Sequence, residues 1–174
     1  MYSIEDLQEG PPTFPTRMAN EIFQAWLNFA PNKKIPARND IDPLSIPKKY
    51  ISNVWIYEYV SELDTYRQTL AGQNIKEAWQ ETKKSPLIGE FMEQESVDSV
   101  MSRWKFIRET PAVAYYSITT DDEFKYTERI YLPMNDKYGQ VNYIFGCSIY
   151  ERLRGIDAAL PPQGKKNALL FKIG

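Results

Sequence analysis

The chain has 174 residues, of which 43% are hydrophobic and 14% aromatic, and its formal net charge is -2. This amount of apolar material in a chain of one domain's length predicts a folded, soluble, single-domain protein. The sequence contains no histidine, which excludes Ser-His-Asp and Cys-His catalytic units, histidine-containing zinc sites and haem held by a proximal histidine. The near-neutral charge gives no electrostatic footprint for nucleic acid or for an anionic membrane.

The single cysteine, Cys147, lies in an apolar run and cannot form an internal disulfide, so we expect a buried, inert thiol. The first residues lack the basic start and apolar stretch of a signal peptide. No window approaches the roughly 20 apolar residues that a membrane-spanning helix needs. The sequence therefore predicts a cytoplasmic protein.

An amphipathic helix is predicted over residues 18–29, after an irregular arm at residues 1–15 that is rich in proline. Thr16 is the predicted N-cap, and Pro31 follows the end of the apolar pattern. The aromatic side of this helix carries Phe23 and Trp26. Such a side is typical of core packing or of a dimer contact, with a cofactor site as the alternative, and we predict that Phe23 and Trp26 form a dimer or partner contact.

Residues 31–49 contain four prolines and predict an extended, turn-rich connector. Arg38, Asp40, Asp42 and Pro43 form a polar cluster in it. We expect these side chains to brace the connector through turn hydrogen bonds and ion pairs, with a polar functional site as the alternative. A divalent cation on Asp40 and Asp42, or on residues 121–123, is a weaker alternative because neither run has the spacing of a calcium loop.

The remaining elements predict an α+β domain with helices packed against an antiparallel sheet. Strands at residues 54–60 and 64–72 form a hairpin, and strands at 112–118, 126–132 and 141–150 form a meander. Between them, helices start at the capping box of Asn74 and Glu77 and at Ser85-Pro86, and the clearest helical period runs from Val97 to Ile107. The expected units are an arm at 1–15, a domain at 16–153 and a tail at 154–174 whose apolar end docks on the domain or pairs with another chain.

Residues 35–47 read IPARNDIDPLSIP. They resemble P-x-R-x-D-I-D-P-x-x-I-P, the signature of a family of small bacterial stand-alone PAS-like proteins. Residues 128–134 and 141–146 are similar to its closing strand pair, and the Trp26 helix resembles its leading Y-x-x-W helix, with Phe23 at an aromatic position. The resemblance covers about residues 18–150. It implies a PAS-like five-stranded antiparallel sheet with a helical insert between strands two and three.

The chain departs from the family at the end of the second strand. There the family has R-L-x-G-T, whereas residues 69–73 are TLAGQ, so Thr69 replaces the arginine. Arg67 lies two positions upstream, on the same side of the strand, and is the candidate substitute. This departure bears directly on whether the family's ligand chemistry is shared.

A PAS-like sheet either fills its concave face with side chains or encloses a small ligand. We favour a mostly filled core. The candidate lining residues of a ligand cavity are Tyr57, Arg67, Trp79, Trp104, Tyr115, Arg129 and Tyr143. The cofactor, if any, is unknown, because histidine-bound haem is excluded and a light-sensing flavin site with a reactive helical cysteine has no counterpart.

Two functions from different classes follow. The first is a non-catalytic sensory or interaction module that acts through a small ligand, a signalling partner protein or a homodimer, with the Phe23 and Trp26 helix transmitting the change. The second is a small acid-base enzyme that uses carboxylates and tyrosines, for which the chain shows no GxGxxG, Walker, GxSxG or HExxH motif. A packed scaffold without a ligand is a variant of the first. No nucleic acid, membrane or metal is expected to be a partner.

Overall fold

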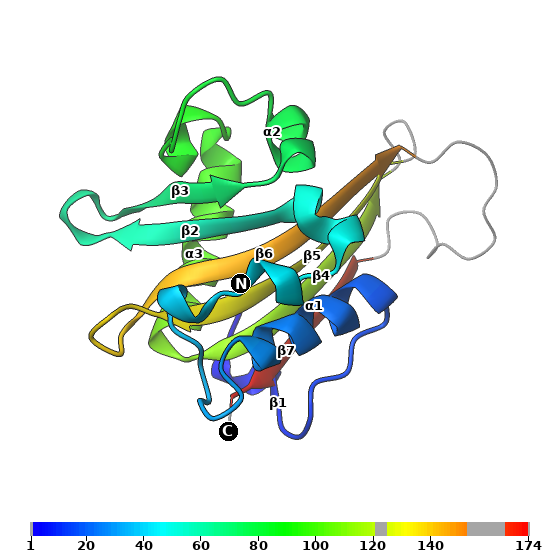
Figure 1. Ribbon diagram of the computed structural model, residues 1–174. Helices are drawn as coiled ribbons and strands as arrows, with labels where there is room; N and C mark the ends of the chain where they lie inside the picture. The colour runs from blue at the N-terminus through cyan, green and yellow to red at the C-terminus, as the bar shows by residue number, and fades with distance from the viewer. Residues whose placement is uncertain (1, 121–124, 153–165, 174) are drawn as a thin grey trace.

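The computed structural model describes residues 2–120, 125–152 and 166–173, and its centre is one seven-stranded sheet (Figure 1). The strand order is β1-β7-β4-β5-β6-β2-β3. The β1 and β7 strands pair in parallel, and all other neighbours are antiparallel. The strands span β1 (Leu7–Gln8), β2 (Val54–Val60), β3 (Thr65–Ala71), β4 (Ala112–Thr120), β5 (Lys125–Asn135), β6 (Val141–Arg152) and β7 (Lys166–Lys172).

The expectation of five strands is wrong because the two ends of the chain add β1 and β7 to the sheet. The β7 strand pairs with β4 from Lys166–Ile118 to Lys172–Ala112, which covers an edge that five strands would leave open. The β1 strand then pairs with β7 through Leu7 and Gln8. The segments expected to be an arm and a tail therefore contribute strands within the same chain.

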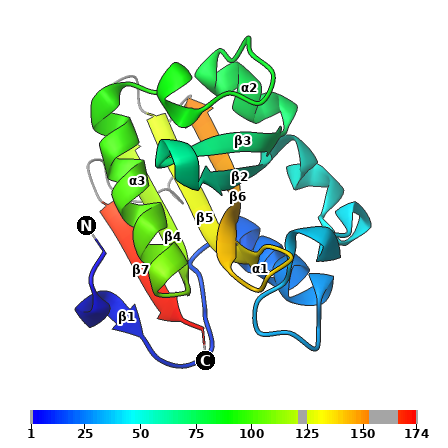
Figure 2. The same ribbon diagram turned by 90° about the vertical axis from the view of Figure 1, so that its left-hand side faces the viewer.

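The helices lie on both faces of the sheet, with α1 (Arg17–Phe29) on one side and α2 (Gln73–Trp79) and α3 (Gln94–Glu109) on the other (Figures 1 and 2). We call these sides the α1 face and the insert face. Each has its own cluster of buried hydrophobic side chains. Short 3-10 helices span Ile4–Asp6, Arg38–Asp40, Pro43–Ser45, Lys48–Asn53, Ser61–Leu63 and Ile88–Glu90.

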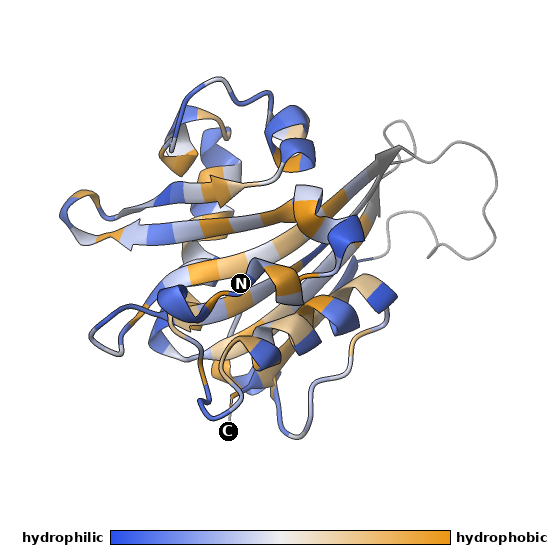
Figure 3. Ribbon diagram, in the orientation of Figure 1, coloured by the Kyte–Doolittle hydropathy of each residue, from blue (hydrophilic) through white to orange (hydrophobic). Residues whose placement is uncertain are grey.

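The α1 helix packs its apolar side against the sheet. Figure 3 shows hydrophobic and hydrophilic residues alternating along this helix. The Thr16 hydroxyl accepts a hydrogen bond from the Ala19 backbone N–H at 3.3 Å, which caps the helix. Trp26 is only 1% exposed, and its indole N–H donates to the Pro133 carbonyl at 3.0 Å. Phe23 stacks on Trp26 and is half-buried. Because Trp26 is core, the expectation that it forms a dimer or partner contact is wrong.

The helical insert, residues 73–109, follows the predicted order but not the predicted helix starts. The α2 helix begins after Gly72, so Asn74 is not a cap, and its side-chain amide donates to the Asn53 side chain at 3.0 Å. No α-helix starts at Ser85-Pro86. The Pro86 carbonyl accepts the Gln68 backbone N–H at 2.9 Å, which holds this segment extended against the edge of β3.

The connector before β2 is a series of 3-10 turns, the first opened by Arg38 and the next by Pro43. Asp40 accepts the Ala37 backbone N–H at 2.7 Å and pairs with Lys33. Asp42 accepts the Leu44 backbone N–H at 3.0 Å. Both aspartates therefore supply turn hydrogen bonds that no regular element provides.

The cation site considered as an alternative would need several acidic side chains that lie close together. Within the described ranges, no group of three or more acidic or cysteine side chains is placed to hold a metal ion. The acidic run at residues 121–123 lies outside the described residues. None of the helices that the described residues form has the length and apolar character needed to cross a bilayer.

Candidate functional site

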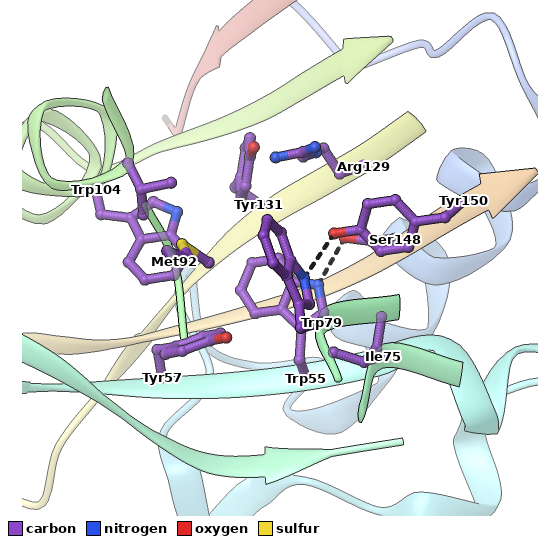
Figure 4. Close-up of a pocket in the computed structure, with 11 residues that line it drawn as sticks. Trp55, Tyr57, Ile75, Trp79, Met92, Trp104, Arg129, Tyr131, Ser148 and Tyr150 are labelled. Atoms are coloured by element: carbon purple, nitrogen blue, oxygen red, sulfur yellow. Dashed lines mark hydrogen bonds between the residues drawn. The ribbon is translucent and has the colours of Figure 1, made fainter. Parts of the chain in front are cut away.

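A cavity of about 20 Å³ lies between the insert face of the sheet and the helices that cover it (Figure 4). This volume holds about one water molecule, so side chains fill most of the space. The lining is strongly aromatic, and it draws on β2, β5, β6, α2 and α3. The lining residues are Trp55, Tyr57, Ile75, Trp79, Met92, Val100, Trp104, Arg129, Tyr131, Ser148 and Tyr150.

The sheet register explains why large rings fit here. Trp55 of β2 and Tyr131 of β5 lie directly opposite Gly146 of β6, which stands between them. A side chain at Gly146 would overlap the Trp55 indole, so glycine at this position lets the indole lie over β6. Trp104 from α3 packs on the rings of Trp55 and Tyr57. Its ring centroid lies 5.6 Å from that of Trp55 and 4.7 Å from that of Tyr57.

Several polar groups of the lining are paired with one another. The Trp55 indole N–H donates to the Ser148 hydroxyl at 2.8 Å, and the Trp79 indole N–H donates to the Tyr150 hydroxyl at 3.2 Å. The buried Gln68 amide donates to the Tyr57 hydroxyl at 3.0 Å and to the Glu81 carboxylate at 2.8 Å. These contacts connect α2 and the segment after it to the sheet.

Other buried polar atoms of the lining have no hydrogen-bond partner. They are the Trp104 indole N–H, the Arg129 Nε–H and the Tyr131 hydroxyl. Buried donors without partners are uncommon because each loses its hydrogen bond to water and gains nothing in return. Figure 4 shows the Tyr131 hydroxyl beside the Arg129 guanidinium. The lining therefore combines aromatic rings with hydrogen-bond donors that have no partner.

Arg129 takes no part in any ion pair that the described residues form. Its guanidinium lies over the rings of Tyr116 and Tyr150, with Cζ 5.9 and 5.7 Å from the two centroids. Burial acts to lower the pKa of Arg129, but its electrostatic interactions with Tyr131 and Tyr150 outweigh this effect and raise it. The group is therefore a permanent, partly desolvated positive charge.

Two tyrosines of this face, Tyr57 and Tyr66, have a raised pKa and are protonated at physiological pH. Burial raises the pKa of Tyr57, and the hydrogen bond from Gln68 offsets this only in part. Burial also raises the pKa of Tyr66 to about 12. Protonated tyrosines offer O–H donors rather than bases. Among the described residues that line the cavity there is no carboxylate, so the chemistry on offer is hydrogen-bond donation, positive charge and aromatic surface.

Four of the seven predicted lining residues, Tyr57, Trp79, Trp104 and Arg129, line the cavity. The other three predictions are wrong, because those side chains do not point into the cavity. Tyr115 points to the α1 face, where its hydroxyl bonds to the Glu128 carboxylate at 2.9 Å.

The remaining two candidates also lie elsewhere. The Tyr143 hydroxyl bonds to Glu58 at 3.1 Å, and its ring packs on the α1-face cluster. Arg67 is exposed on β3, where its backbone pairs with Leu87, so it does not replace the family arginine at a cavity.

Sequence reasoning missed the other lining residues, and two of them had a usable signal. Trp55 alternates with Tyr57 on β2, and Tyr131 alternates with Arg129 on β5, so each shares a side of its strand with a predicted lining residue. Ser148, Met92 and Tyr150 had no such signal, because they depend on strand register and on how the insert folds back. Cys147 is buried on the α1 face, and burial raises the pKa of its thiol, as an inert cysteine requires.

Comparison with known proteins agrees with this architecture. No curated protein matches the chain. A family model described as a PAS domain matches residues 15–149, which include α1, the insert, the strands β2 to β5 and most of β6. The match covers most of the chain and nearly the same residues as the resemblance noted from the sequence. The chain therefore belongs to the PAS domain family.

Proposed function

We propose that this protein is a non-catalytic sensory module in which a small molecule, bound between the helical insert and the sheet, shifts the insert and so changes a protein contact. PAS domains in general serve as sensory or interaction modules, and this supports the class of function. The observation that carries the proposal is the aromatic cavity with its unpartnered donors at Trp104, Arg129 and Tyr131. A bound molecule would supply the acceptors that these donors lack.

The covering segment is suited to move. Between α2 and α3, only Pro86 and Ile88 are buried, and Gln80 and Ser85 adopt left-handed backbone angles of +52° and +49°. Segments with few buried contacts open locally at low free-energy cost. Trp79 and Met92, which line the cavity, are both only half-buried. A ligand larger than a water molecule would enter by displacing these two side chains.

Displacement would also break specific hydrogen bonds. The Trp79–Tyr150 and Gln68–Glu81 bonds connect the insert to β6 and β3, and an occupant that pushes Trp79 outward would strain both. The insert would then have two positions, and a ligand that fits one of them better shifts the population toward it. This two-position insert is the element through which ligand occupancy would reach a partner.

The lining chemistry favours binding over the alternative of acid-base turnover. The two residues that a tyrosine and carboxylate mechanism would combine, Tyr131 and Glu128, point to opposite faces of β5. The donors and rings that do converge are suited to hold a molecule in one orientation. No observation gives the enzyme hypothesis a comparable set of groups.

Native mass spectrometry of the full chain, purified under mild conditions, tests the proposal, with mass analysis of whatever denaturation releases. We expect a small molecule in stoichiometric amount for the natural sequence. The variant Val100→Phe fills the cavity and should lose it, whereas Val97→Phe, one turn earlier on α3 and not part of the lining, should keep it. A small molecule retained equally by both variants, or found with neither the natural sequence nor the control, would contradict the proposal.

A further inference from the structure

A second, larger hollow lies on the insert face beside the cavity. It is a groove of about 550 Å³, within the range of small-molecule sites. Its lining comes from the N-terminal segment, α3, β4 and β7, and consists of Tyr2, Asp6, Gln8, Ser99, Arg103, Tyr116, Lys166, Ala168, Leu169 and Leu170. The N-terminal residues form one wall, with the Tyr2 ring packed edge-on against Phe106 of α3.

The groove and the cavity meet at a layer of two arginines and two tyrosines. Arg103 and Tyr116 belong to the groove, and Arg129 and Tyr131 belong to the cavity. The Arg103 Cζ lies 5.7 Å from the Tyr116 ring centroid and 5.9 Å from that of Tyr131. The Arg129 Cζ lies 5.9 Å from the Tyr116 centroid. Two guanidinium groups thus flank the same ring.

Four polar atoms of this layer and its cover are buried without a hydrogen-bond partner. They are Arg103 Nε, Arg129 Nε, the Tyr131 hydroxyl and the Tyr2 hydroxyl. All four can donate, and burial raises the pKa of Tyr2, with Tyr131 adding to the shift, so its hydroxyl is protonated. Neither arginine pairs with a carboxylate among the described residues. The acidic group of the groove, Asp6, already accepts from the Ser3 N–H and hydroxyl at 2.8 and 2.9 Å.

We propose that the groove binds a small organic anion whose oxyanion group, a carboxylate or a phosphate monoester, is held by Arg103, with Arg129 behind the Tyr116 ring as the second positive charge. A guanidinium presents paired N–H donors that match two oxygens of such a group, and a second cation nearby increases the attraction. The apolar part of the ligand would lie against Ala168, Leu170 and the Tyr116 ring, which share the insert face. Lys166 adds a further positive charge to the groove wall.

This inference rests on the proposed sensory function and adds the ligand class and its anchors. Residues 2–6 would act as a cover, because the Tyr2 hydroxyl is buried over the arginine layer without a partner of its own. An anion in the groove would give that hydroxyl an acceptor. It would also give Arg129 the counter-charge that no described side chain supplies.

The test measures binding of benzoate and of phenyl phosphate to the full chain by isothermal titration calorimetry, with neutral benzamide as the uncharged match. We expect at least one of the two anions to bind one per chain, and benzamide to bind at least about tenfold more weakly. Arg103→Gln and Arg129→Met should each weaken anion binding by about tenfold or more. Arg67→Gln, exposed on β3 at the far edge of the sheet, should leave it unchanged.

Thermal unfolding separates this role from a purely structural one. An unpaired, partly desolvated cation opposes folding, so Arg129→Met should melt at the same or a higher temperature than the natural sequence without added anion, and should lose the stabilisation that the anion gives. A lower melting temperature with unchanged anion binding would assign Arg129 a structural role and overturn the inference.

The outcomes also distinguish this inference from the proposed function. Equal affinity for benzoate and benzamide, or no binding of either anion at millimolar concentration, overturns the anion site. If native mass spectrometry still finds a neutral molecule that Val100→Phe excludes, the sensory proposal stands. Binding of phenyl phosphate without benzoate supports the inference and narrows the group to phosphate.

Discussion

The two faces of the sheet differ in how their buried polar groups are satisfied. On the α1 face, the Trp26 indole bonds to the Pro133 carbonyl and the Tyr115 hydroxyl bonds to Glu128. On the insert face, Trp104, Arg129 and Tyr131 each bury a donor without a partner. Because unsatisfied buried donors cost free energy, a face built only for stability would not keep them. The α1 face therefore satisfies these buried polar groups within the protein, and the unpartnered donors of the insert face are the groups that the proposed ligand would satisfy.

The largest expected effect tests the stabilising role of the α1 face. Trp26→Ala should lower the free energy of unfolding by about 3–5 kcal/mol, because it leaves a large cavity beneath α1 and an unpaired Pro133 carbonyl. Urea unfolding measures this loss. Leu27→Ala, at a side chain 37% exposed on the same helix, is the control and should change stability little. A small loss of stability in Trp26→Ala would contradict the stabilising role of the α1 face.

Gly146→Ala tests how the aromatic wall of the insert face is assembled. The added methyl group would overlap the Trp55 indole and the Ile130 carbonyl oxygen, so we expect a loss of about 1–3 kcal/mol and a changed near-ultraviolet circular dichroism spectrum. Gly89→Ala is the matched control, since a methyl group there meets nothing within 4 Å. Equal behaviour of the two variants would show that Trp55 is not seated over Gly146.

A pair of tyrosine substitutions compares the faces directly. Tyr115→Phe removes a buried hydrogen bond to Glu128 and should cost about 1–2 kcal/mol. Tyr131→Phe removes a buried hydroxyl that has no partner, so it should cost close to nothing or stabilise slightly. Both rings are at most 1% exposed, which makes the packing change similar. The account fails here if the Tyr131 variant loses as much stability as the Tyr115 variant in urea unfolding.

The smallest expected effect concerns pH and Glu81, which holds the insert to Gln68. Burial raises the pKa of Glu81 above its usual value, and the Gln68 hydrogen bond lowers it only in part. The folded state therefore binds a proton more readily than the unfolded state, and stability falls as pH rises from the unfolded pKa through the folded pKa. Glu81→Gln keeps an acceptor for Gln68 and should be more stable at pH 7, by less than about 1 kcal/mol for this half-exposed group.

Thermal unfolding of the two proteins across pH 4 to 8 provides the measurement. The advantage of Glu81→Gln should vanish near pH 4, where the carboxyl group is protonated in both states. An advantage that is the same at both ends of this range would show that the charge of Glu81 is not its cause.

Much of the fold could be predicted because each main element carries its own pattern. The alternation in β2 and the helical period of α3 are local, and both elements lie where the sequence predicts them. The β1 and β7 strands could not be predicted, because β1 has only two residues and β7 pairs with a strand far away in sequence. Strand additions of this kind depend on which sheet edge is free.

The site was only partly predictable, because the residue pattern of a strand such as β4 does not show which of its sides faces the helices. Both sides of β4 are mostly apolar, with Ala112, Ala114 and Tyr116 on one and Val113, Tyr115 and Ser117 on the other. Alternation alone therefore cannot decide which side meets the helices. In the structure, Ala112 and Ala114 join the buried cluster of the insert face together with Ile107 of α3, and Tyr115 joins the cluster of the α1 face.

The four tryptophan indole N–H groups allow the most direct test of the difference between the faces. Trp26 reports on the α1 face, and Trp55, Trp79 and Trp104 report on the insert face, where only the Trp104 indole lacks a partner. We would follow their signals in a nitrogen-15 correlation spectrum while titrating into the full chain whichever of benzoate and phenyl phosphate binds in the calorimetric test. The account predicts a saturable shift of the Trp104 signal with the Trp26 signal unmoved. A shift at Trp26, or no shift at any of the four, would contradict it.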